Sequence, residues 1–404
     1  MKRILFVDDE PNVLSGLQRM LRGMRCQWEM AFVGSGQAAL ERLSQKRFDI
    51  IVSDMRMPAM DGADLLIQVK KLYPHMVRII LSGHSSKPMV MKSVRPAHQY
   101  LAKPCNADKL ISVLTRSSLL SDFLRNEDLA GLVSQMESLP TLAETYQELM
   151  AELDSQDPSV GRVGEIVSRD MGMAGTLLKL ANSAFFGLSR NISSPIEAVM
   201  LLGLEVVKGL AVSANIFSTF EQGVVPGFSF DALWRHSINT GGIGKRIAQA
   251  EAMDKLLVDE ALISGMLHDL GKLVLASQLP IEYNGVLELV RLENRPVWRV
   301  EQEVLGTTHA EVGAYLMGLW GLSDNIVHAL AFHHRPQDCG ERQFGLIPLV
   351  YVANCLEHAL CVINENYARR ELDGAYLAEL GLTGKISGWL KLGKETLQCE
   401  AGNE

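Results

Sequence analysis

The chain has 404 residues, with 39 basic and 47 acidic side chains and a formal net charge of −8. This length favours two or three domains, and the 47% of apolar residues is sufficient for sizeable cores. The acidic balance and the dispersed basic residues argue against a nucleic-acid-binding surface, so no DNA partner is expected.

Cysteine usage and hydropathy indicate the compartment. The six cysteines are scattered without a CxxC pair, which favours reduced thiols over disulfides or zinc ligands. No apolar run approaches the roughly 20 residues of a membrane-spanning helix. The apolar run at residues 4–7 is too short for a signal peptide. We therefore expect a soluble, cytoplasmic protein without a membrane partner.

Strand and helix signals alternate over the first 120 residues. Apolar runs predict strands at 4–7, 28–33, 50–52, 77–81 and 99–102. Helical periodicity occupies the intervals between them and predicts helices at 11–23, 37–43, 65–72 and 110–120. This alternation predicts an α/β domain with a doubly wound, five-stranded parallel sheet.

Polar side chains follow these strands, and they are Asp8, Asp9, Asp54, Ser82 and Lys103. Because the carboxyl ends of parallel strands meet at one edge, these side chains should converge there. Three carboxylates in one pocket require a cation, and oxygen ligands favour Mg²⁺. Lys103 would neutralise a phosphoryl group, Ser82 would donate to it, and Asp54 would be the nucleophile that forms an acyl phosphate. The alternative is that these are unrelated loop residues.

Four motifs of this region resemble the receiver domain of two-component response regulators, and they lie at residues 7–10, 53–62, 81–83 and 100–104. The resemblance implies a flavodoxin-like fold and a sensor histidine kinase as partner. It also implies that Asp54 is the phosphoacceptor. Asp9, Asp54 and the backbone carbonyl of Arg56 would bind Mg²⁺ directly, and Asp8 would bind it through water. Ser82 and Tyr100 match the switch pair that reorients on phosphorylation.

Residues 117–128 are amphipathic and predict a connecting helix that extends the last helix of the receiver. We divide the chain into a receiver at 1–120, a helical linker at 121–130, a helical domain at 131–335 and a helical extension packed on it at 336–404.

The second half contains helix after helix and no strand of period two, so an all-α domain is predicted. The predicted helices span residues 143–153, 160–167, 174–181, 195–202, 206–217, 310–319, 326–332, 346–360, 375–380 and 384–392.

A set of potential metal ligands is spread over these helices, and it comprises His236, His268, Asp269, His309, His333 and His334. Side chains from several helices can meet in a bundle core, as they do in carboxylate–histidine metal sites. The alternative is that some of them cap helices or form hydrogen bonds in the core. The pattern leaves both interpretations open.

The same residues are similar to the HD superfamily of metal-dependent phosphohydrolases. Their order and spacing are similar to its HD-GYP branch, which hydrolyses cyclic diguanylate at a site of two or three metal ions. Three departures weaken that similarity. No Gly-Tyr-Pro follows His334, an aspartate is replaced by Asn354, and a glutamate one turn before His236 is replaced by Ala232. A two-metal site without these carboxylates loses charge and affinity.

Residues 139–142, 177–187 and 192–203 resemble the HDOD domain, an HD-related output domain. The resemblance implies a helical, mostly non-hydrolytic module that is often attached to receivers and acts through other signalling proteins.

Two functions remain. In the favoured one, a Mg²⁺-dependent response regulator is phosphorylated at Asp54 and switches a non-catalytic HDOD domain that binds an unknown signalling protein. We expect a homodimer in at least one phosphorylation state. The alternative is a phosphorylation-regulated metal phosphohydrolase that acts on a cyclic dinucleotide. Under the favoured hypothesis the histidine set is vestigial, and no transition metal is expected.

Overall fold

The computed structural model describes the chain except at residues 83–95, 125, 137–139, 142, 183–191, 205–206, 209–217, 220–224, 341, 362–371 and 402–404. It forms two compact units. The first comprises Met1–Glu137 with the segments Lys179–Asn191 and Tyr315–Gly321, and the second comprises the remainder.

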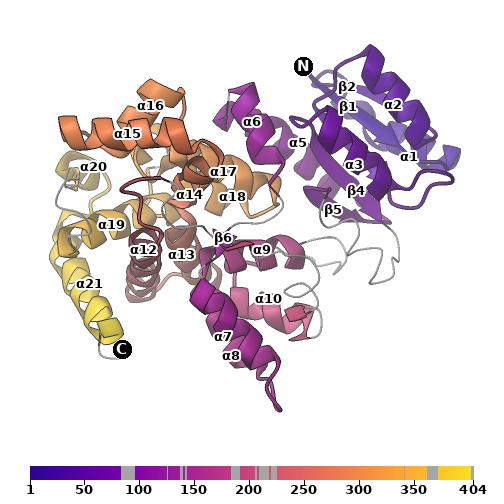
Figure 1. The fold of residues 1–404 in the computed structure, drawn as a ribbon. Coiled ribbons are helices and arrows are strands. Elements are labelled where there is room, and N and C mark those ends of the chain that lie inside the picture. Colours follow the sequence, from indigo (N-terminus) through magenta and orange to yellow (C-terminus); the bar gives the residue numbers. More distant parts are fainter. Residues whose placement is uncertain are drawn as a thin grey trace. The chain divides into compact units, whose positions relative to one another are not determined.

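A five-stranded parallel sheet with the strand order β2-β1-β3-β4-β5 forms the centre of the first unit (Figure 1). This order is that of the flavodoxin-like doubly wound fold, and it confirms the predicted fold class. The strands are β1 (Lys2–Val7), β2 (Trp28–Val33), β3 (Ile50–Asp54), β4 (Val77–Ser82) and β5 (Gln99–Ala102).

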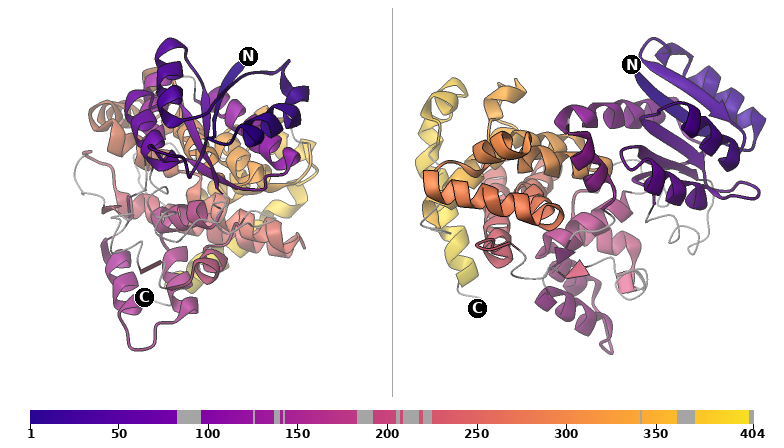
Figure 2. Two further views of the ribbon diagram at one scale, coloured as in Figure 1. Left: turned by 90° about the vertical axis from the view of Figure 1, so that its right-hand side faces the viewer. Right: turned by 45° about the horizontal axis from the view of Figure 1, so that its top comes forward.

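Helices lie on both faces of this sheet (Figure 2). On one face Leu5, Ile51 and Ile80 pack against Ala39 and Leu66 from the neighbouring helices. Burial on both faces explains why the strands are continuous apolar runs. The helices of this region are α1 (Pro11–Met20), the short 3₁₀ helix η1 (Arg22–Met24), α2 (Gly36–Gln45), α3 (Gly62–Leu72), α5 (Ala107–Phe123) and α6 (Glu127–Ser134).

The connecting helix is interrupted, contrary to the prediction of one continuous helix. Helix α5 ends at Phe123, and Leu124 has an extended backbone with φ −128° and ψ 94°. Asn126 then begins α6, because its Oδ1 accepts a hydrogen bond from Leu129 N at 3.1 Å. Amphipathic periodicity continues through this break, so the pattern alone did not reveal it.

A buried arginine holds the end of α6. Arg78 lies on β4 and is 1% exposed. Its guanidinium donates to backbone carbonyls of Pro74, Met76, Pro96 and Ser134. The imidazole of His98 contributes as well, since its Nδ1 accepts from Arg78 N at 3.1 Å and its Nε2 donates to Ser134 O at 2.8 Å. The last carbonyl of α6 is therefore fixed to strand β4 and to the residue before β5.

We expect the Arg78→Met variant to release α6. Methionine keeps an apolar stem but leaves several buried carbonyls without donors, which costs about 3 kcal/mol. Hydrogen–deuterium exchange of the α6 amides should accelerate accordingly. Arg42→Met, at an exposed position on α2, is the matched control. Equal protection of α6 in both variants would contradict this assignment.

The buried His98 should make the first unit sensitive to acid. Burial, and then the charge of Arg78, hold the pKa of His98 well below its usual 6.5. The folded chain therefore keeps His98 neutral, whereas the unfolded chain protonates it as the pH falls below about 6.5. Stability should decline by up to about 1.4 kcal/mol per pH unit below that point. Exchange protection of β4 and β5 at pH 7.5 and 5.5, corrected for intrinsic rates, measures this decline. His98→Gln should reduce it.

The described part of the remaining chain is largely helical, as predicted, and its longest helix α12 packs against α13, α19 and α21. The helices are α7 (Ala143–Leu153), α8 (Val160–Ser168), α9 (Met171–Ala181), α10 (Pro195–Leu202), α12 (Phe230–Ala250), α13 (Lys255–Leu267), α14 (Leu270–Gln278), α15 (Pro280–Glu293), α16 (Val297–Leu305), α17 (His309–Leu319), α18 (Asp324–Phe332), η3 (Pro336–Cys339), α19 (Leu346–Leu360), α20 (Gly374–Glu379), η4 (Thr383–Lys385) and α21 (Ile386–Ala401).

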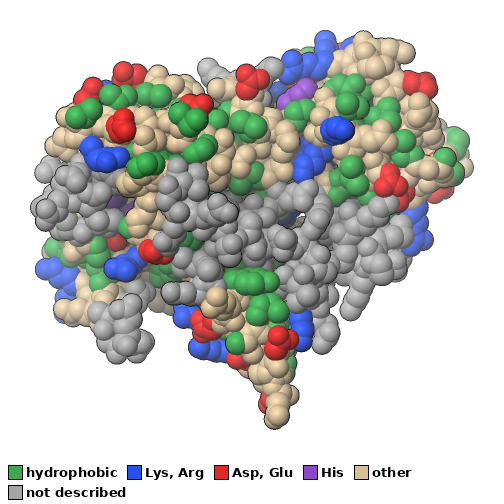
Figure 3. Space-filling model, in the orientation of Figure 1, with side chains coloured by type: hydrophobic (Ala, Val, Ile, Leu, Met, Phe, Trp, Pro, Cys, Tyr) green, Lys and Arg blue, Asp and Glu red, His purple; other side chains and the backbone are tan. Residues whose placement is uncertain are grey.

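One small departure from the all-α prediction is a two-residue parallel pair, β6 (Pro140–Thr141) with β7 (Ser218–Thr219). The helix predicted at 206–217 falls mostly on residues outside the described part. Among the described helices, none is both long and apolar enough to cross a membrane. On the face drawn in Figure 3, basic side chains are interspersed with acidic and apolar ones.

Candidate functional sites

The first site lies at the carboxyl edge of the sheet and brings together Asp8, Asp54 and Lys103. Asp8 is 1% and Asp54 7% exposed. The ammonium group of Lys103 donates to Asp8 Oδ2 at 2.6 Å and to Asp54 Oδ1. Burial would lower the pKa of Lys103, but hydrogen bonds to Asp54 and Asp8 raise it, so the lysine stays charged. The predicted convergence of these three residues is present.

The turn after β3 presents the Asp54 side chain. The backbone N–H of Arg56 donates to Asp54 Oδ2 at 2.6 Å. A methyl group at Gly62 would collide with the backbone carbonyl of Asp54, so only glycine fits there. Asp61 begins α3, because its Oδ1 accepts from Asp64 N at 2.8 Å. The Asp61–Gly62 pair therefore closes the loop beneath Asp54.

The donor set fits Mg²⁺. Asp8 and Asp54 are buried carboxylates that already share one cation, and Asp9 follows directly in the chain. A hard divalent ion prefers such oxygen ligands. Asp8 Oδ1 accepts from Glu10 N at 3.0 Å, which fixes its orientation. Asp9, Asp54 and the carbonyl of Arg56 stay the predicted direct ligands of the ion, and Asp8 its predicted ligand through water.

The two predicted switch residues lie on neighbouring strands. β4 ends at Ser82, whose side chain lies outside the described part of the chain. Tyr100 lies on β5, is 8% exposed, and belongs to the apolar core on the same face as Ile80.

The second site is built by helices that approach closely at glycines. A Cβ atom at Gly265 on α13 would lie 2.6 Å from Gly241 Cα on α12. This crossing brings His236 near His268. A methyl group at Gly271 on α14 would likewise collide with the backbone of His309, the first residue of α17. Backbones can approach this far only where a side chain is missing.

Each of four histidines has its Nδ1 engaged by an acceptor that faces away from the centre. His236 Nδ1 donates to Glu357 Oε2 and His309 Nδ1 to Glu301 Oε2, both at 2.5 Å. The remaining two donate to backbone carbonyls at 2.7 Å, namely His268 to Gly265 and His333 to Leu330. A carbonyl or carboxylate oxygen only accepts, so each Nδ1 carries the hydrogen. In the neutral rings, each Nε2 is then a lone-pair donor.

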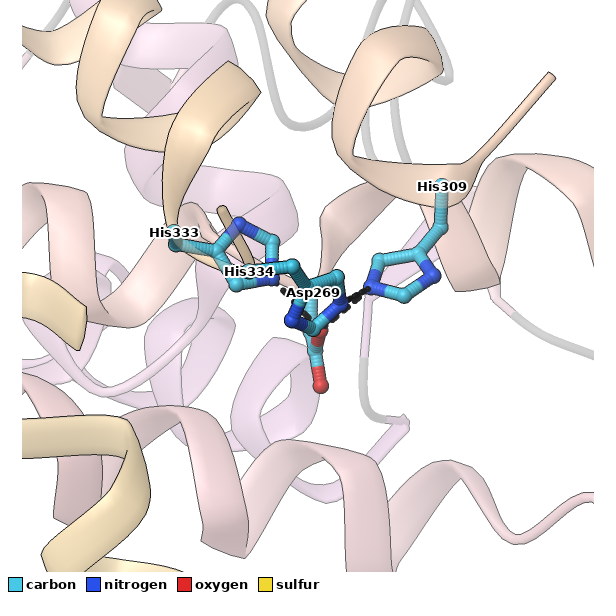
Figure 4. Close-up of side chains that lie close together, drawn as sticks. All are labelled: Asp269, His309, His333 and His334. Carbon is cyan, nitrogen blue, oxygen red and sulfur yellow. Dashed lines mark hydrogen bonds and ion pairs between the residues drawn. The ribbon is translucent and has the colours of Figure 1, made fainter. Parts of the chain in front are cut away.

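These Nε2 atoms surround the carboxylate of Asp269. His236 and His268 lie 3.5 Å from Asp269 Oδ2. His309 lies 3.1 Å and His333 3.7 Å from Asp269 Oδ1. Figure 4 shows the rings of His309, His333 and His334 around this carboxylate. His334 is half-buried, and its Nε2 lies 2.7 Å from His309 Nε2. The members of the predicted set therefore converge in one cluster, which is buried except at His334.

Charge and burial determine how these groups are ionised. Burial holds the pKa of His268 well below its usual value, so the ring is neutral. Burial alone would raise the pKa of Asp269, but His268, Lys272 and the hydrogen bond from His309 hold it well below its usual value. Burial would lower the pKa of His309, yet Glu301 and Asp269 raise it. The ionised carboxylate of Asp269 thus lies beside the neutral ring of His268 and beside His309, whose neighbouring carboxylates favour its protonated form.

This arrangement fits a transition-metal ion. The Nε2 atoms of His236 and His268 are only 3.1 Å apart and both carry lone pairs. Such atoms repel each other unless a cation or a proton lies between them. Imidazole nitrogen and carboxylate oxygen suit zinc, iron and manganese. The amide of Asn354 is fully buried and makes no hydrogen bond to the described residues.

Two family models match the chain. The model of the response regulator receiver domain matches residues 4–115, and the model of the HDOD domain matches residues 139–336. The chain joins a receiver domain to an HDOD domain.

Among curated relatives, an uncharacterized protein of Treponema pallidum (strain Nichols) is 27% identical over 229 residues, 56% of this chain and 43% of the relative. The transcriptional regulatory protein ZraR of Escherichia coli O157:H7 is 30% identical over 179 residues, 44% of this chain and 40% of ZraR. The chain thus spans less than half the length of these relatives. The MmoQ response regulator of Methylococcus capsulatus has a TM-score of 0.49 and 24% identity, covering 63% of this chain and 98% of MmoQ.

Two residues of the HDOD cluster were not identified from the sequence. Glu301 on α16 and Glu357 on α19 are both fully buried. Glu357 lies beyond the matched HDOD residues, so the region predicted as a packed extension supplies part of the cluster. The similarity to the HD superfamily places an aspartate at the position of Asn354, and in the structure a carboxylate, Glu357, lies one turn later on the same helix. For Glu357 the available signal was an acidic residue in a largely apolar helical stretch, whereas Glu301 lies among other charged residues such as Arg299 and Glu303 and gave no such signal.

Proposed function

We propose that the chain is a response regulator whose receiver domain accepts a phosphoryl group on Asp54 and thereby changes the activity of the HDOD domain. The observation that supports this most directly is the bridging of Asp8 and Asp54 by Lys103 at the carboxyl edge of the sheet. A buried carboxylate beside a fixed ammonium group is suited to accept a phosphoryl group.

In this reaction an Asp54 carboxylate oxygen attacks phosphorus, the P–N bond of a phosphohistidine on the kinase breaks, and an acyl phosphate forms. Lys103 balances charge on the phosphoryl oxygens, and the Arg56 N–H holds the other oxygen of Asp54. When bound, Mg²⁺ supplies further neutralisation of that charge. The partner is a sensor histidine kinase, as the receiver domain implies in general.

For the output we propose that the HDOD domain acts on another signalling protein and that phosphorylation changes self-association of the chain. Tyr100 lies on the edge strand β5, beside the residues that hold α6. A switch on this strand is therefore linked to the connection into the HDOD domain.

A change in self-association can be measured directly. Light scattering on the full chain, with and without beryllofluoride and Mg²⁺ as a phosphate mimic, should show a monomer–dimer change. Asp54→Asn should show none. A monomer under both conditions would contradict the proposed dimer. Phosphorylation of the receiver domain at Asp54 is tested separately, by measuring phosphoryl uptake.

A second candidate function is a metal-dependent phosphohydrolase. It is favoured by one observation, the convergence of four histidine Nε2 atoms on Asp269. The two Asp269 oxygens each face a pair of histidines, an arrangement that suits two metal ions. Lys272, which donates to Asp269 Oδ2 at 2.6 Å, would lie beside a substrate phosphate. The substrate class is a cyclic dinucleotide or another nucleotide phosphoester.

Elemental analysis of protein purified without chelator or metal-affinity tag tests this candidate. One or two equivalents of iron, manganese or zinc, absent from His268→Ala, would support it and justify a substrate screen. Protein without transition metal that also fails to bind added Mn²⁺ would leave the HDOD domain as a binding module.

A further inference from the structure

Two buried glutamates lie behind the histidine cluster, on its outer side. Glu301 accepts three hydrogen bonds, from His309 Nδ1 at 2.5 Å, from His309 N at 2.9 Å and from Tyr283 Oη at 3.0 Å. Glu357 accepts from His236 Nδ1 at 2.5 Å and from Asn239 Nδ2 at 3.3 Å. Burying a carboxylate costs free energy unless the group is paired and hydrogen-bonded. The groups that donate to Glu301 and Glu357 must therefore offset this cost.

We propose that Glu301 and Glu357 are positioning residues that hold His309 and His236 in the Nδ1–H tautomer, with Nε2 presented as a metal ligand toward Asp269. This proposal rests on the metal centre of the second candidate function. Glu301 and Glu357 lie outside the predicted set of ligands, and each would orient one histidine of that set.

The geometry supports this assignment independently at two places. Each glutamate contacts the ring nitrogen that points away from Asp269, while Nε2 of the same ring lies 3.1 Å (His309) or 3.5 Å (His236) from Asp269. The two glutamates come from different helices, α16 and α19, and the histidines that they contact face different oxygens of Asp269. A carboxylate behind a ligating imidazole fixes the ring and raises its basicity.

The other two histidines show what the glutamates add. His268 and His333 have the same tautomer, but backbone carbonyls enforce it. Those carbonyls belong to the helix immediately before each histidine, since Gly265 and Leu330 precede them by three residues. His309 begins its helix and His236 lies within a long one, so neither has a suitable local carbonyl. A side chain from another helix must supply the acceptor.

A metal titration tests the proposal. The full chain is stripped of metal, and Co²⁺ binding is followed by calorimetry and by the absorption of the bound ion. Glu301→Gln and Glu357→Gln should each weaken Co²⁺ binding about 10- to 100-fold, as loss of such a carboxylate does in other sites. Wild-type affinity in both variants would overturn the proposal.

Glu260→Gln is the matched control. Glu260 is also buried, at 1% exposure, and accepts two hydrogen bonds, from Ser323 Oγ at 2.6 Å and Asn325 Nδ2 at 3.0 Å, so that its donors are a hydroxyl and an amide rather than an imidazole. Its variant should bind Co²⁺ within about 2-fold of wild type. Equal losses in all three variants would show a general effect of lost buried charge and would also overturn the proposal.

A second measurement does not require metal. Two-bond ¹H–¹⁵N spectra of histidine-labelled, metal-free protein at alkaline pH report the tautomer of each ring. His236 and His309 should carry hydrogen on Nδ1 in the wild type and shift toward Nε2–H in the glutamine variants, since an amide can donate to Nδ1. His268 and His333 should not change. Absence of Co²⁺ uptake by the wild type would end the phosphohydrolase candidate, whereas Nε2–H tautomers in the wild type would overturn the positioning role.

Discussion

Asp54→Asn should abolish phosphoryl uptake by the receiver domain from a small acyl-phosphate donor in the presence of Mg²⁺. The amide has nearly the shape of the carboxylate, so the fold should be retained, but it lacks the nucleophilic charge. It also removes one of the two negative groups that hold Lys103. Intact-mass measurement of the full chain should show one added phosphoryl group in the wild type and none in the variant.

Asp61→Asn is the control for this experiment. Asp61 lies in the same loop and begins α3, and asparagine begins helices about as well as aspartate. This variant should take up phosphate as the wild type does. Stable phosphorylation of Asp54→Asn would show that another residue is the acceptor.

Asp269→Asn should remove the metal affinity of the HDOD cluster. The carboxylate faces His236 and His268 with one oxygen and His309 and His333 with the other. Its loss removes the only negative charge at the centre of these four rings among the described residues. Because the residue would itself be a ligand, the loss should exceed the roughly 100-fold effect of an outer carboxylate. Titration of metal-stripped protein with Mn²⁺ measures it.

Asp338→Asn provides a control at a half-exposed aspartate just beyond the matched HDOD residues, 3.5 Å from Arg335 Nη1. It should leave Mn²⁺ binding unchanged. Circular dichroism establishes whether Asp269→Asn is folded, since Asp269 is also the partner of Lys272. A folded variant with wild-type Mn²⁺ affinity would show that the cluster is not a metal site.

Local patterns were sufficient for the fold. The strands at 28–33 and 99–102 and the helices at 143–153 and 346–360 have the predicted bounds. Asp54 could be identified because a buried strand ends at it and turn residues follow. Convergence of Asp8, Asp54 and Lys103 then follows from parallel strands alone, since their ends share one edge.

The helical cluster could be predicted only in part. Histidines are rare enough to attract attention as ligands, but a glutamate on a helix is ordinary. Glu301 and Glu357 acquire their roles only through the packing of α16 and α19, which no local period encodes. The sequence predicted a cluster with too few carboxylates, because only the positions of direct metal ligands were compared. In the structure two further carboxylates, Glu301 and Glu357, lie behind the histidine rings and accept hydrogen bonds from Nδ1 of His309 and His236.

The hydrogen bonds from Arg78 and His98 to Ser134 O, at the end of α6, determine where this protein can be divided into fragments. A fragment ending at residue 120 would lack Ser134, so Arg78 and His98 would lose the carbonyl that they share. A fragment through residue 137 retains it. Chimeras that exchange receivers between response regulators should therefore place the junction after α6 rather than after α5. A recipient receiver without an arginine and a histidine at the equivalent strand positions would leave the transplanted helix undocked.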